Sequence, residues 1–167
     1  MDKTIQIDTF SRITQVSRET ITSLKKYEDI LIKANKTLNL VGNSTINDIW
    51  TRHFLDSAQL IDFIDKNDKT LVDLGSGAGF PGLVLAITLK DRKIPLKIKL
   101  IDKSPKKVKF LKDLISKLHV DVEVINENIL KDLTTLSEDI IKLESENCKF
   151  TLLYQFFKKN KKKIYKK

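Results

Sequence analysis

Leu71–Gly82 reads LVDLGSGAGFPG, and this stretch decides the fold. Its first residues, Leu71 to Asp73, are a short apolar run that ends in an acid, which is typical of a buried strand. Glycines then occupy every second position from Gly75 to Gly79, and Pro81 opens an apolar run that predicts a helix. The order of strand, glycine-rich turn and helix predicts a loop that cradles a phosphate or nucleotide, because glycine accepts positive φ and lets a ligand approach the backbone.

The residues before this loop predict helices. Between Phe10 and Leu38 the apolar residues recur at intervals that suit one or two amphipathic helices. A second helical stretch is expected from about Thr45 to Ile64, followed by a polar turn. We therefore expect residues 1–65 to form an N-terminal helical segment.

The residues after the loop alternate between strand and helix patterns. The expected order is a strand at Leu96–Ile101, a helix that begins at Pro105, a strand at Val120–Ile125, a helix at Ile129–Leu143 and a strand at Phe150–Tyr154. Ser104 fits the N-cap of the first of these helices. This alternation predicts an α/β domain with a parallel sheet and right-handed crossovers, here a partial Rossmann-like domain over residues 66–155.

The positive charge of the chain is concentrated at its end. Of the 31 basic residues, seven are lysines within Lys158–Lys167, a stretch without acids. The other 24 basic residues nearly balance the 22 acidic ones, so most of the formal charge of +9 belongs to this stretch. We expect residues 156–167 to be an aberrant lysine-rich tail, with neither core periodicity nor a return to strand.

Composition excludes several protein classes. No uninterrupted apolar run is long enough to span a membrane, and the first residues lack the apolar region of a secretory signal. A single cysteine, Cys148, cannot form an internal disulfide and suits a reducing cytoplasm. It has no clustered histidine or cysteine, so no metal site is expected. These features predict a cytoplasmic protein, which we expect to be a monomer.

The register of the glycines distinguishes two classes of cofactor. The dinucleotide fingerprint G-x-G-x-x-G needs a glycine where Phe80 stands. The pattern D-x-G-x-G-x-G fits Asp73-Leu-Gly75-Ser-Gly77-Ala-Gly79 and is typical of methyltransferases that use S-adenosyl-L-methionine. That cofactor has no pyrophosphate, and its ammonium group suits the negative charge near Asp73. The sequence therefore favours S-adenosyl-L-methionine over a dinucleotide.

A second acid, Asp102, directly follows the next expected strand. Because the carboxyl ends of parallel strands meet at one edge of the sheet, its carboxylate is placed to accept hydrogen bonds from both hydroxyls of a ribose. The dinucleotide fold shares this acid, so it does not discriminate between the two cofactors. A purely structural turn, with Asp73 and Asp102 as strand-end caps, is the remaining interpretation.

Three blocks of the sequence resemble one methyltransferase family. They are LVDLGSGAGFPGLVLAI from Leu71, RHFLDSAQL over Arg52–Leu60, and LIDKSPKKVKFL over Leu100–Leu111. Together they look like the RsmG (also GidB) family, whose W-N-K-x-x-N-L segment is also similar to residues 34–40, with Ala34 in place of the tryptophan. The resemblance covers about Tyr27 to Leu153. It implies a bacterial enzyme that transfers a methyl group from S-adenosyl-L-methionine to N7 of a guanine in 16S ribosomal RNA.

The resemblance also implies roles for single positions. The residues that would line the cofactor, shape its turn or hold its ribose are Gly75, Gly77, Gly79, Phe80 and Asp102. Ile129 and Leu130 match the pair that flanks the adenine in the family. An acid is common in that pair and Leu130 is not one, so only a backbone contact is implied there.

The helix before the glycine loop is expected at the mouth of the pocket. The resemblance places Arg52, His53 and Asp56 there, facing the cofactor or the RNA. An intrahelical ion pair between Arg52 and Asp56 is the structural alternative. No general acid or base is expected, because N7 of guanine has a free lone pair and no proton to lose, so alignment of the reacting atoms suffices.

A cluster of lysines follows Asp102. Lys106 and Lys107, with Lys103 and Lys109 beside them, form either a solvated helix face or a basic patch that contacts RNA phosphates. The sequence leaves both interpretations open.

The end of the chain departs from the family. The family's fourth strand runs F-D-x-x-x-S-R-A-F, whereas Thr151 stands here in place of the acid and Phe156 in place of the arginine. We expect a C-terminally truncated or frameshifted copy whose activity is impaired. The alternatives are a non-catalytic remnant or RNA-binding module, with the lysine tail gripping RNA, and an NAD-dependent oxidoreductase.

Overall fold

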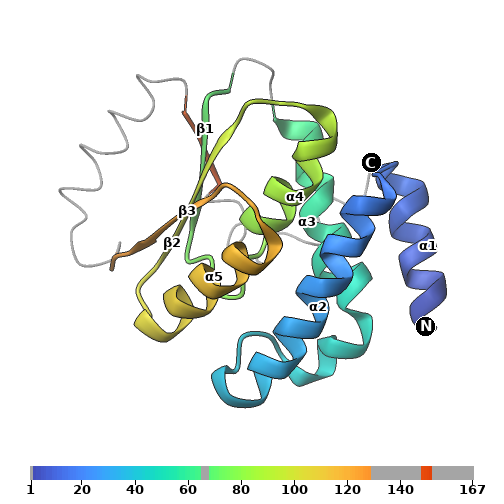
Figure 1. The fold of residues 1–167 in the computed structure, drawn as a ribbon, viewed down its shortest axis with the longest axis horizontal. Helices are drawn as coiled ribbons and strands as arrows, with labels where there is room; N and C mark the ends of the chain where they lie inside the picture. The colour runs from blue at the N-terminus through green and yellow to red at the C-terminus, as the bar shows by residue number, and fades with distance from the viewer. Residues whose placement is uncertain (1, 65–67, 129–147, 152–167) are drawn as a thin grey trace, which may run out of the picture.

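The computed structural model describes residues 2–64, 68–128 and 148–151. A group of N-terminal helices packs beside an α/β part, in which strands and helices alternate (Figure 1). The predicted fold class is confirmed: the structure is a Rossmann-like α/β fold preceded by helices.

The sheet is parallel throughout, as predicted. Its strands are β1 (Thr70–Leu74), β2 (Lys97–Asp102), β3 (Glu123–Asn126) and β4 (Cys148–Thr151). They lie in the order β3-β2-β1-β4, so the chain moves outward from β1 to β3 and then returns to the other side of β1. In open parallel sheets ligands bind outside the carboxyl ends of the strands at such a reversal. The glycine loop leaves β1 at this point.

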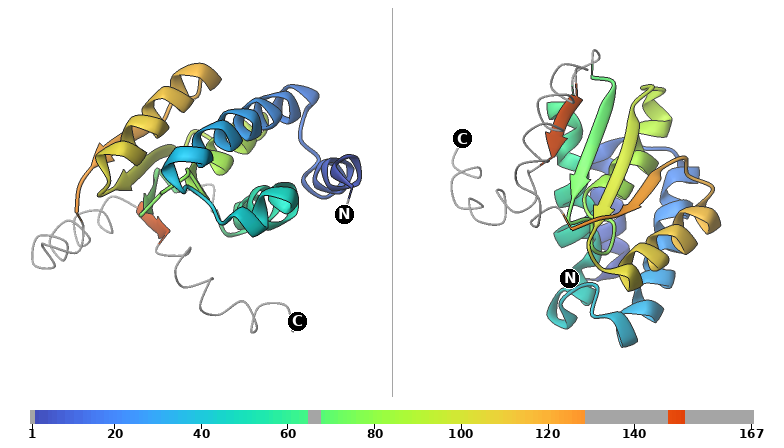
Figure 2. Two further views of the ribbon diagram at one scale, coloured as in Figure 1. Left: turned by 90° about the horizontal axis from the view of Figure 1, so that it is seen from below. Right: turned by 90° about the vertical axis from the view of Figure 1, so that its left-hand side faces the viewer.

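Two helices connect the first three strands. They are α4 (Gly82–Arg92) and α5 (Pro105–Leu118). Right-handed crossovers in one direction place both on the same face of the sheet, and α2 packs over them from outside (Figure 2). Because α4 contacts both the strands and the N-terminal helices, its residues before the charged last turn are almost all apolar and buried. Its residues Leu83, Val84 and Leu85 are fully buried.

The N-terminal segment begins with two α-helices, α1 (Lys3–Thr14) and α2 (Arg18–Leu38). The Asp2 carboxylate accepts a hydrogen bond from Thr4 N–H, and the Ser17 hydroxyl accepts one from Thr20 N–H, so both helices begin at capping side chains. The expected helical region over Phe10–Leu38 is thus two helices that meet near residue 16.

The second predicted helical stretch is helical but irregular. It comprises a 3₁₀ turn η1 (Asn43–Asp48), a π-helix η2 (Trp50–Leu55), a short α-helix α3 (Asp56–Ala58) and a further 3₁₀ turn η3 (Gln59–Phe63). A π-turn holds more residues than an α-turn, so it changes which side chains point inward. Both Trp50 and Phe54 are fully buried on η2.

A buried polar contact fixes the irregular stretch to the helices before it. Trp50 Nε1 donates to Glu28 Oε2 at 3.0 Å, and the same carboxylate pairs with Lys3 at 2.9 Å. Gln6 Nε2 donates to the main-chain oxygen of Asn47 at 2.8 Å. The helices α1, α2 and η2 are therefore held together by hydrogen bonds as well as by apolar packing.

One hydrophobic cluster joins the N-terminal helices to the α/β part. It includes Phe10, Tyr27 and Trp50 from the former and Phe80 and Leu100 from the latter. The division into residues 1–65 and 66–155 stays a prediction, but the two parts share a core.

Some details differ from the sequence predictions or lie outside the described residues. Ser104 is the N-cap residue of α5, but its side chain makes no capping hydrogen bond. Strand β4 begins two residues before the predicted start at Phe150, and the rest of that predicted strand lies outside the described residues. The predicted helix at Ile129–Leu143 and the lysine-rich tail also lie outside them. Within the described ranges, no helix is both long and apolar enough to cross a membrane.

Candidate functional site

The loop after β1 has the backbone conformation that its glycines predict. Gly75, Gly77 and Gly79 all have positive φ, at 77°, 57° and 101°. The N–H groups of Gly75 and Ser76 donate to the main-chain oxygen of Ile101 in β2, at 2.8 and 3.1 Å. The first turn of the loop therefore crosses from β1 over the carboxyl end of β2.

Gly75 and Gly79 differ in the space around them. A Cβ added at Gly75 would meet no atom within 4 Å, so the space beside it is open. A Cβ at Gly79 would lie 2.6 Å from the Tyr27 hydroxyl and 3.2 Å from a Leu111 methyl, so the loop is tightly packed there. The first glycine faces the cavity, and the third fits the loop against α2 and α5.

Asp73 lies beneath the loop. Its carboxyl is fully buried: Oδ2 accepts a hydrogen bond from Gly82 N–H at 2.9 Å, and Oδ1 has no partner among the described residues. Burial raises the pKa of the Asp73 carboxyl to about 7, although hydrogen bonds from the Gly82 N–H and Ser76 oppose the rise; the charge of Asp102 makes a smaller contribution in the same direction as burial. The carboxyl therefore joins the end of β1 to the start of α4. A role in cofactor binding stays a prediction, and from this position it would act through the loop.

Asp102 organises the other side of the loop. Its Oδ2 accepts from Gly77 N–H and its Oδ1 from Ser104 N–H, both at 2.8 Å. Each carboxylate oxygen has a second lone pair, so both remain able to accept from a further donor. The carboxylate thus fixes the glycine loop to the start of α5 at the carboxyl edge of β2.

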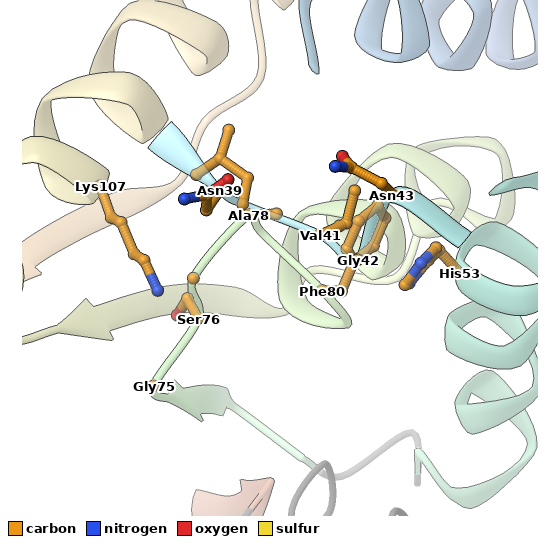
Figure 3. Close-up of a pocket in the computed structure, with 12 residues that line it drawn as sticks. Asn39, Val41, Gly42, Asn43, His53, Gly75, Ser76, Ala78, Phe80 and Lys107 are labelled. Carbon is orange, nitrogen blue, oxygen red and sulfur yellow. The ribbon is translucent and has the colours of Figure 1, made fainter. Parts of the chain in front are cut away.

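A cavity of about 420 Å³ lies beside the loop, within the size range of small-molecule sites (Figure 3). Two segments line it, the glycine loop from Gly75 to Ala78 and the segment Asn39–Asn43 after α2. Three single residues complete the lining: His53, Phe80 and Lys107. Lys107 extends from α5 toward Ser76, whereas His53 lies on the opposite side (Figure 3). The cavity therefore unites residues from both parts of the chain.

Stacked rings form one wall of the cavity. The His53 and Phe80 rings stack at 4.9 Å with an interplanar angle of 22°, and the Phe80 and Tyr27 rings stack at 5.5 Å with an angle of 13°. His53 Nε2 lies 2.8 Å from the Thr45 hydroxyl. Phe80 is almost fully buried, so its ring binds the loop to the N-terminal helices.

The segment Asn39–Asn43 owes its shape to a buried asparagine. Asn35 Oδ1 accepts from Val41 N–H at 2.8 Å, and its Nδ2 donates to Asn43 Oδ1 at 3.2 Å. Asn35 is 3% exposed. Sequence reasoning noted Asn35 only as part of a family segment and missed its role. The available signal was a polar residue on the apolar face of a predicted helix.

The remaining predicted site residues are placed as follows. Arg52 is exposed and pairs with Asp48 at 3.9 Å, one turn before it, and Asp56 is half-buried at the start of α3. Lys106, like Lys103, is exposed, and Lys109 pairs with Asp113 at 2.8 Å. Ile129 and Leu130 lie outside the described residues. The described residues include no group of three or more side chains suited to hold a metal ion.

Comparisons with known proteins agree with the geometry. A family model described as GidB, rRNA small subunit methyltransferase G, matches residues 20–159. A Paramagnetospirillum magneticum protein named ribosomal RNA small subunit methyltransferase G is 41% identical over 126 residues, 75% of this chain and 58% of that protein. A protein of the same name from Rhodospirillum centenum is 50% identical over 99 residues, 59% of this chain and 44% of that protein.

The chain spans less than two thirds of the length of these relatives. The matched residues nevertheless include the glycine loop, both strand-end acids and all but the first two residues of the helix α2. The resemblance seen in the three sequence blocks is confirmed, and the chain belongs to the rRNA small subunit methyltransferase G (GidB) family.

Proposed function

We propose that this chain binds S-adenosyl-L-methionine at the glycine loop and serves the transfer of its methyl group to N7 of a guanine in 16S ribosomal RNA. The observation that supports this most is the open space at Gly75, beside a cavity at the carboxyl edge of β1 and β2. The names of the relatives support a ribosomal RNA as substrate.

The residues present fit this cofactor. Gly75 has positive φ and would leave room for a ligand at the backbone, and the Asp102 carboxylate keeps free lone pairs at the edge of the sheet. We infer that Gly75 and Gly77 would contact the methionine part and that Asp102 would accept hydrogen bonds from the ribose. The cofactor supplies a methyl group on a positively charged sulfur.

The chain's own residues would then position the acceptor. His53 and Asn43 line the side of the cavity opposite Gly75 and Lys107 (Figure 3). Because guanine N7 has no proton to lose, these groups need only hold the base in line with the methyl group and exclude water. Lys106 and Lys107 would attract RNA phosphates on the other side of the cavity.

A dinucleotide is less well accommodated. The third glycine of its fingerprint is replaced by Phe80, whose ring is buried against Tyr27 and His53. An oxidoreductase is therefore the weaker candidate. A cytoplasmic location and a monomeric state remain part of the proposal.

Calorimetry and a transfer assay test the proposal in sequence. The purified chain should bind S-adenosylhomocysteine and not NAD, and Asp102→Ala should abolish this binding while Asp113→Ala, an exposed carboxylate on α5, should leave it unchanged. Tritiated S-adenosyl-L-methionine with small ribosomal subunits should then label guanine N7 of the RNA, to an extent reduced by the expected impairment of activity. Binding of NAD instead of S-adenosylhomocysteine would contradict the proposal.

A further inference from the structure

A tyrosine of α2 reaches the glycine loop across 51 positions of sequence. The Tyr27 hydroxyl donates to the main-chain oxygen of Ala78 at 2.6 Å. Both residues are buried, so this hydrogen bond is shielded from water. The Tyr27 ring also stacks on the ring of Phe80, two residues after Ala78 in the loop.

Gly79, which lies between Ala78 and Phe80, packs against the Tyr27 side chain as well. A Cβ at Gly79 would lie 2.6 Å from the Tyr27 hydroxyl, so the loop approaches the tyrosine as closely as a glycine permits. Gly79 also has a φ of 101°, a backbone angle that residues other than glycine rarely adopt. Three consecutive loop residues, Ala78, Gly79 and Phe80, therefore take their places against one tyrosine.

Glycine-rich loops lose much conformational entropy when they are ordered. A loop that is already held in the bound conformation loses less on ligand binding and so binds more tightly. Asp102 and Asp73 hold the first and last parts of this loop through Gly77 N–H and Gly82 N–H. Tyr27 holds the part between them.

We propose that Tyr27 is a positioning residue for the cofactor loop, through which the N-terminal helices set the affinity of the site. This inference rests on the proposed function, because it assumes that the loop binds S-adenosyl-L-methionine. Tyr27 does not line the cavity, so it acts only through the backbone of Ala78 and the ring of Phe80.

Two conservative variants separate positioning from general stability. Tyr27→Phe removes the hydroxyl and keeps the ring. Thr88→Val is the matched control, because the fully buried Thr88 hydroxyl also donates to main-chain oxygens, Val84 O at 2.8 Å and Leu85 O at 3.2 Å, within its own helix α4. Each variant thus loses one buried hydroxyl that donates to the main chain.

Two measurements are made on the full chain and on both variants. Calorimetry gives the dissociation constant of S-adenosylhomocysteine, which should rise about tenfold in Tyr27→Phe and stay unchanged in Thr88→Val. Amide hydrogen exchange without ligand should become faster at Gly79, whose N–H donates to Ser76 O at 2.7 Å, in Tyr27→Phe alone.

The outcomes are distinct. Wild-type affinity and exchange in Tyr27→Phe would overturn the inference, as would equal losses in both variants. If the wild-type chain bound no S-adenosylhomocysteine, the proposed function would be overturned, and the exchange rates alone would then decide whether Tyr27 positions the loop.

Discussion

At the scale of single residues, the acid and the glycines of the loop have separable tasks. The Asp73 carboxyl is buried and holds the start of α4, whereas Gly75 leaves space at the cavity. The glycine pattern in the sequence predicts that the loop turns sharply, since no other residue tolerates this succession of positive φ values. It does not predict which glycine faces the cavity and which one packs, because that depends on Tyr27 and Leu111, far away in sequence.

The buried acid predicts a pH dependence of stability. Burial raises the folded-state pKa of Asp73 from 3.8 to about 7, so the folded state holds the proton more strongly than the unfolded state. The protonated Asp73 carboxyl therefore contributes fully to the free energy of unfolding below pH about 4, and this contribution is lost as pH rises toward 7. Urea denaturation between pH 4 and 7 should show a decline in the free energy of unfolding that is smaller in Asp73→Asn. The exposed Asp113→Asn serves as control, and an unchanged slope in Asp73→Asn would contradict this assignment.

Substitutions at Gly79 and Gly75 should affect different properties, the stability of the fold and the binding of the cofactor. Gly79→Ala should lower the free energy of unfolding by roughly 2 kcal/mol or more, because its Cβ would lie 2.6 Å from the Tyr27 hydroxyl. Gly75→Ala should cost only about 1 kcal/mol, since its Cβ meets no atom within 4 Å. Gly75→Ala should instead weaken S-adenosylhomocysteine binding. Thermal unfolding with calorimetry distinguishes the two, and equal destabilisation by both would refute the assignment.

At the scale of elements, α2 is the least expected contributor to the site. The apolar period of the sequence predicts the helix, and its inner face carries Tyr27 and Asn35. These side chains do not line the cavity but hydrogen-bond to the backbone of two residues that do, Ala78 and Val41. Such contacts join residues far apart in the chain, so a periodic pattern cannot reveal them. The sequence does not predict the π-helix η2 either, because its residues fit an α-helical pattern equally well.

The segment Asn39–Asn43 should depend on Asn35. Asn35→Ala leaves the Val41 N–H without its acceptor and should cost about 1–3 kcal/mol of unfolding free energy. Amide exchange should become faster at Val41 before the rest of the fold is affected. Thr37→Ala removes an exposed hydroxyl of the same helix and should change neither quantity. Unaltered protection at Val41 in Asn35→Ala would contradict this role.

At the scale of the whole molecule, the helices and the sheet share one hydrophobic cluster. The sequence pattern correctly separates a helical part from an α/β part, but the separation describes the order of the elements and not two cores. Tyr27, Phe54 and Phe80 pack together across that border. The site lies on the same border, so its integrity requires both parts.

This shared core predicts a single unfolding transition. Trp50, the one tryptophan of the sequence, is buried among the N-terminal helices, while far-UV circular dichroism reports on the whole chain. Urea denaturation curves from tryptophan fluorescence and from circular dichroism should coincide. An earlier midpoint for the fluorescence curve would show that the N-terminal helices unfold independently.

The central claim, that the loop after β1 is the cofactor site, is tested most directly by a nuclear magnetic resonance titration. Isotope-labelled chain is titrated with S-adenosylhomocysteine, and amide shifts are followed residue by residue. The account predicts the largest shift changes at Gly75, Ser76 and Gly77 and at Asp102 beside them. Smaller changes are expected in the segment Asn39–Asn43. Unchanged amide shifts at Gly75–Gly77 in the folded chain, or changes confined to another surface, would contradict it.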